Sequence, residues 1–210
     1  MDTVDSIIFD MDGTLWNAID VYTEAWNRSL LEVGIRRVLT KSEIASMTGW
    51  EKKDILNYLL PHHSEAVHNN VVQRVAQYST SLIPTMKGQL YPGVCEGLSR
   101  LCTKYRLFIL SNCDLGVIDL FMDAAKIRSF FVDHIAHGEN GRPKHENMRL
   151  LINKHRLRSP VYVGDTQQDS EESAKAGVPF VYLTYGFGQS VVYQLRFDTF
   201  PEFTAYYLSS

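Results

Sequence analysis

The chain has 210 residues, of which 45% are hydrophobic and 21% are charged. That length and composition predict a soluble globular protein with one core, or one core and a small accessory domain. The formal net charge is −3 and no long basic run is present, so we expect neither a nucleic-acid nor a membrane partner. No stretch reaches the roughly 20 apolar residues that would span a bilayer, and we expect no signal segment.

Cysteine usage indicates the redox environment. Cys95, Cys102 and Cys113 are an odd number without Cys-x-x-Cys spacing, so a disulfide framework or a zinc site is not expected. We therefore expect a reducing, cytoplasmic location. The sequence leaves the oligomeric state open between a monomer and a small homo-oligomer.

The first predicted strand spans residues 4–10, where a β-branched and aromatic run ends abruptly in acidic residues and a glycine. Asp10 and Asp12 follow two residues apart, and a turn at Gly13 can bring both carboxylates to one reaction centre. One can then act as a nucleophile and the other as a general acid and base. An isolated pair of this kind more often caps a turn or a helix, so the catalytic interpretation needs support from motifs elsewhere in the sequence.

Residues 17–87 contain several helical patterns and no convincing strand. They predict a helical domain inserted between two core segments, 1–16 and 88–210. The Tyr91-Pro92-Gly93 turn is expected to return the chain to the core.

Beyond that turn, helical patterns alternate with short apolar runs that predict strands. The helices are expected over 94–104, 117–126, 147–155 and 169–176, and the strands over 107–110, 161–163 and 180–183. This alternation predicts an α/β core with a parallel, doubly wound sheet. Ligands bind beyond the carboxyl ends of such strands, which is where Asp10, Ser111 and Asp165 emerge.

Candidate metal ligands come from a second acidic cluster at residues 164–169, again after an apolar run. Mg²⁺ prefers oxygen ligands and usually takes one or two carboxylates besides water and substrate oxygens. We expect Asp10 and Asp165 to bind it directly, with the Asp12 backbone carbonyl and Asp169 close by or acting through water. The alternative is that these acids only complement a helix dipole.

Candidate phosphate ligands lie at two further positions. Ser111 and Asn112 can offer a hydroxyl and backbone N–H groups, and a lysine can neutralise the charge of a transferring phosphoryl group. Lys144 is the candidate, with Arg142 as its rival. The alternative for Lys144 is a solvated surface side chain.

Four motifs, taken in chain order, resemble those of the haloacid-dehalogenase-like hydrolase superfamily, in its phosphoglycolate-phosphatase and β-phosphoglucomutase branch. They are Asp10-Met11-Asp12-Gly13-Thr14, Ser111-Asn112, Lys144 and the 164–169 cluster. The resemblance implies a Rossmann-like core with a small α-helical cap. It also implies that Asp10 forms an aspartyl-phosphate, Asp12 is the general acid and base, and Asp165 helps to hold Mg²⁺. Two departures are Asn17, where many relatives have an acid, and the order Pro143-Lys144 instead of Lys-Pro.

In capped relatives the cap largely selects the substrate, so the resemblance also directs attention to residues 48–53. That stretch is similar in position to a loop that approaches the active site, and its glycine and cations could meet an anionic substrate. The candidate specificity residues are Trp16, Gly49, Trp50, Lys52 and Lys53. The alternative is that both lysines belong to a solvated helix face.

The function expected from these residues is Mg²⁺-dependent hydrolysis of a small phosphorylated metabolite through an aspartyl-phosphate. A phosphomutase of the β-phosphoglucomutase type would use the same residues and return the phosphoryl group to a sugar. A non-enzymatic module that binds a phosphorylated ligand is a third possibility, but it would be free to lose Asp10 or Asp12.

Overall fold

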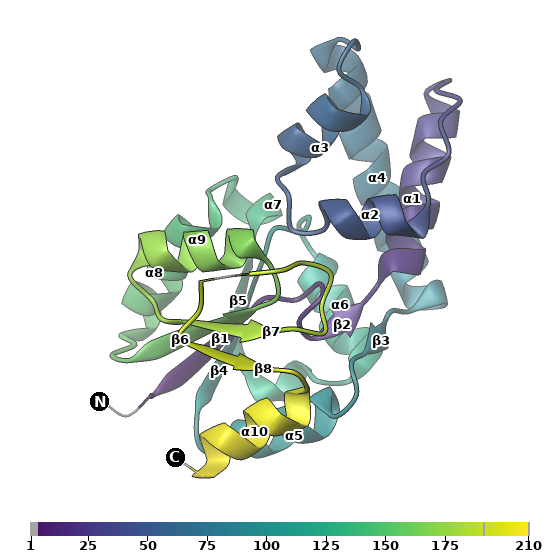
Figure 1. The fold of residues 1–210 in the computed structure, drawn as a ribbon. Helices are drawn as coiled ribbons and strands as arrows, with labels where there is room; N and C mark the ends of the chain where they lie inside the picture. Colours follow the sequence, from purple (N-terminus) through teal and green to yellow (C-terminus); the bar gives the residue numbers. More distant parts are fainter. Residues whose placement is uncertain (1–3, 191, 210) are drawn as a thin grey trace.

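The structure, a computed structural model, describes residues 4–190 and 192–209. Its centre is a six-stranded sheet with the order β5-β4-β1-β6-β7-β8, in which all neighbouring strands are parallel (Figure 1). The strands are β1 (Ser6–Phe9), β4 (Arg106–Ser111), β5 (Phe131–Ala136), β6 (Pro160–Gly164), β7 (Phe180–Leu183) and β8 (Leu195–Phe197). The predicted α/β class with a parallel, doubly wound sheet is confirmed.

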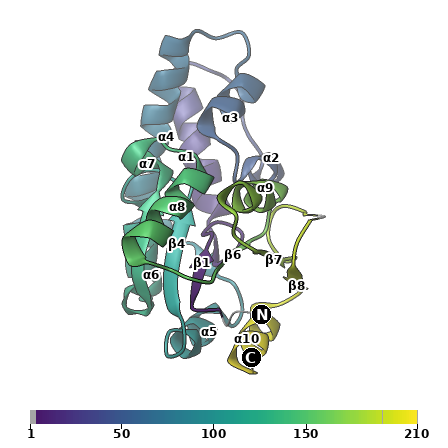
Figure 2. The same cartoon turned by 90° about the vertical axis from the view of Figure 1, so that its left-hand side faces the viewer.

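Helices cover both faces of this sheet because alternate strand residues point to opposite sides (Figures 1 and 2). Phe9 and Ile109 pack with α5 (Val94–Leu101), α6 (Val117–Ala125) and α10 (Phe200–Ser209). Ile8 and Phe108 pack on the other face with α8 (Lys144–His155), beside which lies α9 (Gln167–Ala176). The short η1 (Arg128–Phe130) and α7 (His137–Asn140) complete this part of the chain.

A separate group of four helices, hereafter the helical unit, follows the first strand (Figure 1). It consists of α1 (Ile19–Glu32), α2 (Lys41–Met47), α3 (Lys52–Leu59) and α4 (Glu65–Met86), and these helices share a hydrophobic cluster of their own. Two short antiparallel strands, β2 (Trp16–Asn17) and β3 (Gln89–Leu90), join the entry and exit of the unit to the sheet. Gly88 is needed there because a Cβ atom would meet the ring of Trp16.

The outer strands of the sheet differ from the sequence expectation. The strands expected at residues 107–110, 161–163 and 180–183 are present, but β5 and β8 were not predicted. Strand β5 lies at one edge, where Val132 is 51% exposed and Asp133 and His134 interrupt the apolar run. Strand β8 has three residues, including Arg196. Edge strands bury less surface, so their sequences need not be continuously apolar.

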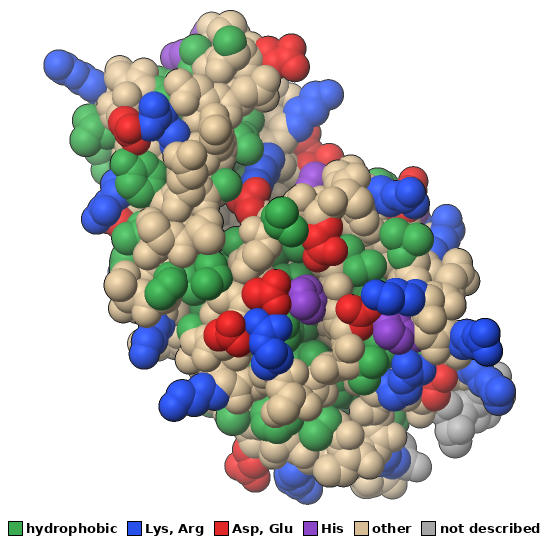
Figure 3. All heavy atoms as spheres, turned by 180° about the vertical axis from the view of Figure 1, so that it is seen from behind, with side chains coloured by type: hydrophobic (Ala, Val, Ile, Leu, Met, Phe, Trp, Pro, Cys, Tyr) green, Lys and Arg blue, Asp and Glu red, His purple; other side chains and the backbone are tan. Residues whose placement is uncertain are grey.

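The surface is charged but mixed in sign. On the face seen in Figure 3, acidic and basic side chains are interspersed, in keeping with the net charge of −3. Among residues 4–190 and 192–209, none of the helices combines the length and the apolar character that a membrane crossing requires.

Candidate active site

Predicted site residues lie at the carboxyl ends of three neighbouring central strands. Asp10 directly follows β1, Ser111 ends β4, and Asp165 directly follows β6. Strand β1 pairs with both of the other strands in parallel, so all three carboxyl ends meet at one edge of the sheet. The backbone N–H of Asp10 donates to the carbonyl of Val163, at 2.8 Å, which extends this pairing to the edge of the site.

The turn after Asp10 depends on Gly13. This residue has φ +90°, a conformation that costs side-chain-bearing residues energy. A Cβ atom at Gly13 would also collide with the carboxylate of Asp165. The turn lets the Thr14 hydroxyl donate to Asp165 Oδ1 at 3.2 Å, so the first motif is tied directly to the second acidic cluster.

Lys144 is the first residue of α8 and is only 4% exposed. Its Nζ donates to Oδ1 of Asp10 and to Oδ1 of Asp169, at 2.8 Å in each case. Burial disfavours the ammonium, but the two carboxylates outweigh burial and hold the pKa of Lys144 well above its usual value. Lys144 is therefore not a solvated surface side chain, whereas its rival Arg142 is exposed.

The two carboxylate oxygens of Asp169 have different partners. Its Oδ2 accepts from the backbone N–H and the hydroxyl of Thr166, at 3.1 and 2.7 Å, and so caps α9. Its Oδ1 accepts from Lys144 and from the hydroxyl of Tyr162. Burial opposes ionisation, but Lys144 and the Thr166 donors prevail and lower the pKa of Asp169. One carboxylate thus both caps α9 and binds Lys144.

Three buried carboxylates crowd together beside this lysine. Oxygen atoms of Asp10, Asp165 and Asp169 all lie within 4.8 Å of one another. Burial, together with the neighbouring carboxylates, raises the pKa of Asp165 to about 7 and that of Asp10 well above its usual value, although Lys144 opposes both shifts. Three acids facing one ammonium leave an excess of negative charge, and oxygen ligands in this arrangement suit a divalent cation. The residues present therefore fit the expected metal.

The loop after β7 completes the surroundings of Asp165. The backbone N–H groups of Phe187 and Gly188 donate to Asp165 Oδ2, at 2.7 and 3.2 Å. At Gly186 a Cβ atom would collide with the same carboxylate. Sequence reasoning missed this loop, although the glycine after the strand at 180–183 was the available signal.

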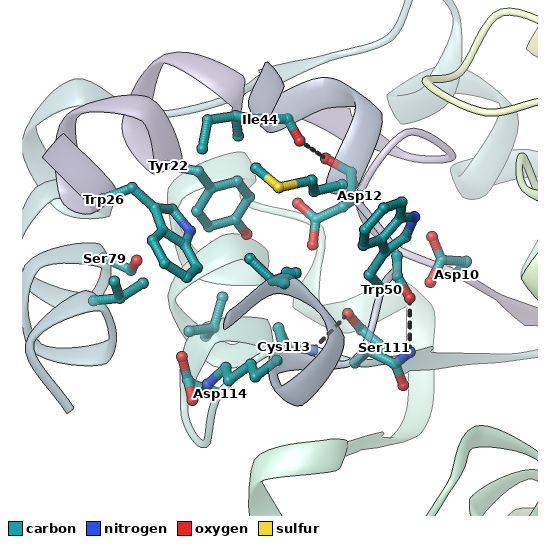
Figure 4. A pocket seen from close by; sticks show the side chains of 18 of the residues that line it. Asp10, Asp12, Tyr22, Trp26, Ile44, Trp50, Ser79, Ser111, Cys113 and Asp114 are labelled. Carbon is teal, nitrogen blue, oxygen red and sulfur yellow. Dashed lines mark hydrogen bonds and ion pairs between the residues drawn. The ribbon is translucent and has the colours of Figure 1, made fainter. Parts of the chain in front are cut away.

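Asp12 lies in different surroundings from Asp10. Its Oδ1 accepts from the indole N–H of Trp16, at 2.9 Å. Burial raises the pKa of Asp12 to about 6, while the neighbouring Tyr22 and Trp16 oppose the shift. The Tyr22 hydroxyl points towards Asp12 (Figure 4), and this contact favours the ionised form of Asp12. A carboxyl group with a pKa near 6 can exchange protons close to neutral pH.

A pocket with a volume of about 120 Å³ opens above these groups, between the sheet and the helical unit (Figure 4). The sheet side contributes Asp10, Asp12, Ser111, Asn112, Asp114 and Lys144. The candidate specificity residues Gly49, Trp50 and Lys52 line the opposite side. Trp16 and Lys53 do not line it, and Trp16 is instead buried under Phe121, with 4.5 Å between the ring centroids.

Two polar contacts join the helical unit to the sheet across this pocket. The side-chain amide of Asn112 donates to the carbonyl of Gly49, at 3.1 Å. The ammonium of Lys52 forms an ion pair with the carboxylate of Asp114. Burial lowers the pKa of Lys52 to about 8, so it remains mostly protonated at pH 7.

Comparison with known proteins places the chain in a family. The profile described as Haloacid dehalogenase-like hydrolase matches residues 7–183. The chain belongs to this family. The resemblance expected from the ordered motifs is thereby confirmed, and the match covers every predicted catalytic, phosphate-binding and metal-binding position.

Named relatives include phosphatases. The chain is 27% identical over 193 residues to a phosphoglycolate phosphatase of Synechococcus elongatus, covering 89% of this chain and 88% of the relative. It is also 27% identical over 214 residues to the probable phosphatase IndB of Dickeya dadantii, covering 93% and 90%.

Solved structures share the fold. A predicted phosphatase from Clostridium acetobutylicum has a TM-score of 0.87 at 18% identity, with both chains covered completely. CbbY from Rhodobacter sphaeroides in complex with phosphate has a TM-score of 0.81 at 18% identity, covering 95% of this chain and 96% of the other.

Proposed function

We propose that this haloacid-dehalogenase-like hydrolase is a Mg²⁺-dependent phosphatase that cleaves a small phosphorylated metabolite through an aspartyl-phosphate on Asp10. The observation that carries the proposal is that Asp10 and Asp12 face one pocket in different surroundings. Lys144 binds Asp10, while burial brings the pKa of Asp12 to about 6. The positive charge of Lys144, and of a cation bound beside it, would favour the ionised, nucleophilic form of Asp10, whereas a pKa near 6 suits Asp12 to transfer protons.

In the first step, a carboxylate oxygen of Asp10 attacks phosphorus and the bond from phosphorus to the leaving-group oxygen breaks. Asp12 gives its proton to that oxygen, so the alcohol departs uncharged. In the second step, Asp12 takes a proton from water, whose oxygen attacks the phosphorus of the aspartyl-phosphate. Inorganic phosphate and the Asp10 carboxylate are released, and Asp12 is protonated again.

Other residues position the phosphoryl group. We assign this role to the Lys144 ammonium, the Ser111 hydroxyl and the backbone around Asn112, all of which line the pocket. When bound by Asp10, Asp165 and the Asp12 carbonyl, with Asp169 nearby, Mg²⁺ would neutralise the crowded carboxylates and the phosphate oxygens.

The helical unit is proposed to act as the cap, formed by residues 17–87 between core segments 1–16 and 88–210, of which residues 1–3, 191 and 210 lie outside the described structure. Its contacts through Gly49 and Lys52 support a role in closing the pocket against water. Trp50 lines the pocket as well, whereas any influence of Trp16 or Lys53 on the substrate must be indirect. The three free cysteines support a reducing, cytoplasmic location, with a monomer or small homo-oligomer as the working state.

The charges that line the pocket favour hydrolysis over phosphomutase chemistry. A phosphomutase would have to hold a second phosphate in the pocket, and Lys52, which the helical unit contributes to the lining, is already paired with Asp114.

The test is phosphate release from a panel of phosphorylated sugars, glycolate, short alcohols and nucleotides, with and without Mg²⁺. We expect release by the wild type only with Mg²⁺, and none by Asp10→Asn. A folded wild type that releases phosphate from no ester would refute the phosphatase. In that case, isomerisation that depends on a bisphosphate activator would establish the mutase instead.

A further inference from the structure

The part of the pocket farthest from Asp10 is the part that must hold the leaving group. Its walls come from α1, α2, α3, α4 and α6 (Figure 4). They are mainly apolar, although Tyr22 and Ser79 add hydroxyl groups. The apolar side chains are Trp26, Ile44, Met47, Ile55, Val75 and Val117. A group enclosed by such walls gains by removing apolar surface from water, and a charged group loses its hydration without compensation.

Lys52 is the only lysine or arginine among the described residues that the helical unit contributes to this pocket. Its ammonium is already paired with the carboxylate of Asp114, which lines the pocket as well. Both side chains are largely sheltered, with 27% and 22% of their surface exposed. The positive charge that could recognise an anionic leaving group is therefore neutralised by the protein itself.

A second anionic group on the substrate would meet two obstacles at this place. It would have to compete with Asp114 for Lys52, and it would stand beside a carboxylate of like charge in a site with little water. An uncharged leaving group meets neither obstacle and leaves the ion pair intact.

We propose that this site selects phosphate monoesters of small, uncharged alcohols and discriminates against esters whose leaving group carries a carboxylate or a second phosphate. The inference rests on the proposed phosphatase function and specifies its substrate class. The apolar walls and the already paired Lys52 suit a small leaving group without a charge of its own. The proposed substrate thus differs from phosphoglycolate, after which several relatives are named.

The first test compares two esters of matched size, isobutyl phosphate and 2-phosphoglycolate, which have the same number of non-hydrogen atoms. We expect the wild type to show a kcat/KM at least tenfold higher for isobutyl phosphate. A kcat/KM for phosphoglycolate equal to or above that for isobutyl phosphate would overturn this inference but not the proposed phosphatase activity. Release from neither ester, nor from any other monoester, would overturn both.

The second test changes the two members of the ion pair separately. Asp114→Asn frees the Lys52 charge, so the kcat/KM ratio should move at least tenfold towards phosphoglycolate. Lys52→Gln leaves Asp114 unpaired, so the ratio should move further towards isobutyl phosphate. The double variant should not show the shift towards phosphoglycolate that Asp114→Asn produces, because it lacks the Lys52 charge.

These opposite directions separate a role in specificity from one in holding the fold, because general disruption would lower both kcat/KM values together. Shifts of the ratio in the same direction for both single variants would contradict the inference. If a variant fails to fold, the ratio of the two wild-type kcat/KM values still tests the inference.

Discussion

At the scale of single residues, Asp10 and Asp12 differ through their neighbours. Asp10 shares the Lys144 ammonium with Asp169, while Asp12 accepts the Trp16 indole N–H. Lys144 opposes the rise that burial and the neighbouring carboxylates cause in the pKa of Asp10, whereas burial keeps the pKa of Asp12 near 6. The two residues therefore lie in different electrostatic surroundings, although they have the same side chain.

Gly13 offers a residue-scale test of the turn that holds these groups together. Gly13→Ala should lower phosphate release at least tenfold, because the added methyl group would displace the Asp165 carboxylate as well as strain a residue with φ +90°. The strain alone costs about 1–2 kcal/mol. Activity and the free energy of unfolding should both be measured.

Gly34→Ala is the matched control for this substitution. Gly34 has φ +82°, but nothing lies within 4 Å of an added Cβ atom. This variant should lose about 1–2 kcal/mol of stability and keep its phosphate release. Equal activity of the two variants would show that the contact between Gly13 and Asp165 does not matter for the reaction.

At the scale of elements, helices α8 and α9 are joined where α8 begins, next to Lys144. Glu172 of α9 accepts from the backbone N–H of His145 at 2.8 Å, is paired with the His145 ring at 2.7 Å, and also binds Lys175. Burial alone would raise the pKa of Glu172, but Lys175 and His145 outweigh it and lower the pKa to about 2. This carboxylate therefore stabilises the helix pair that carries both Lys144 and Asp169.

Glu172→Gln should reduce the free energy of unfolding by about 1.5–3 kcal/mol at pH 7, the range for hydrogen bonds to charged groups. Because the folded pKa lies below the unfolded value of 4.5, the stabilisation is complete above pH 4.5 and is lost as the pH falls towards 2. Denaturant unfolding between pH 7 and pH 2.5 should show the difference between wild type and variant shrink. A difference that stays constant with pH would argue against an ionic origin.

Strands were predictable from the sequence where their hydrophobic pattern was strong. The strands around residues 7–9, 107–110 and 161–163 are buried on both faces, so they are continuously apolar and visible in the sequence. Strand β8, at the edge of the sheet, pairs with β7, and α10 packs on α5, and neither β8 nor α10 was predicted. Their formation depends on partners that lie far away in the chain, which local periodicity cannot reveal.

At the scale of the whole molecule, the metal candidates join distant parts of the chain. Asp10 lies in the first loop, whereas Asp165 and Asp169 lie more than 150 residues later, yet their oxygens converge within 4.8 Å. A cation bound there would hold these segments together in the folded state only, so binding must stabilise the fold.

Mg²⁺ should therefore raise the melting temperature. At a concentration 100 times the dissociation constant, binding adds about 2.7 kcal/mol. For a chain of this size that corresponds to a rise of roughly 5–10 °C. Thermal unfolding in MgCl₂, compared with NaCl of equal ionic strength, measures the shift. Asp165→Asn should reduce it, with its own metal-free protein as the baseline, and an undiminished shift would exclude Asp165 as a ligand.

The sequence by itself determined the α/β fold, the family and the residues at the strand ends, because buried strands and their polar ends leave a local signal. The packed structure was needed to show that Lys144 is buried and Arg142 exposed, that the oxygens of Asp169 are divided between helix capping and Lys144, and that Lys52 pairs with Asp114. The contacts of Lys144 with Asp169 and Asp10 span 25 and 134 residues of chain, and that of Lys52 with Asp114 spans 62. Burial and the approach of opposite charges arise only when separate elements pack, so no local pattern encodes them.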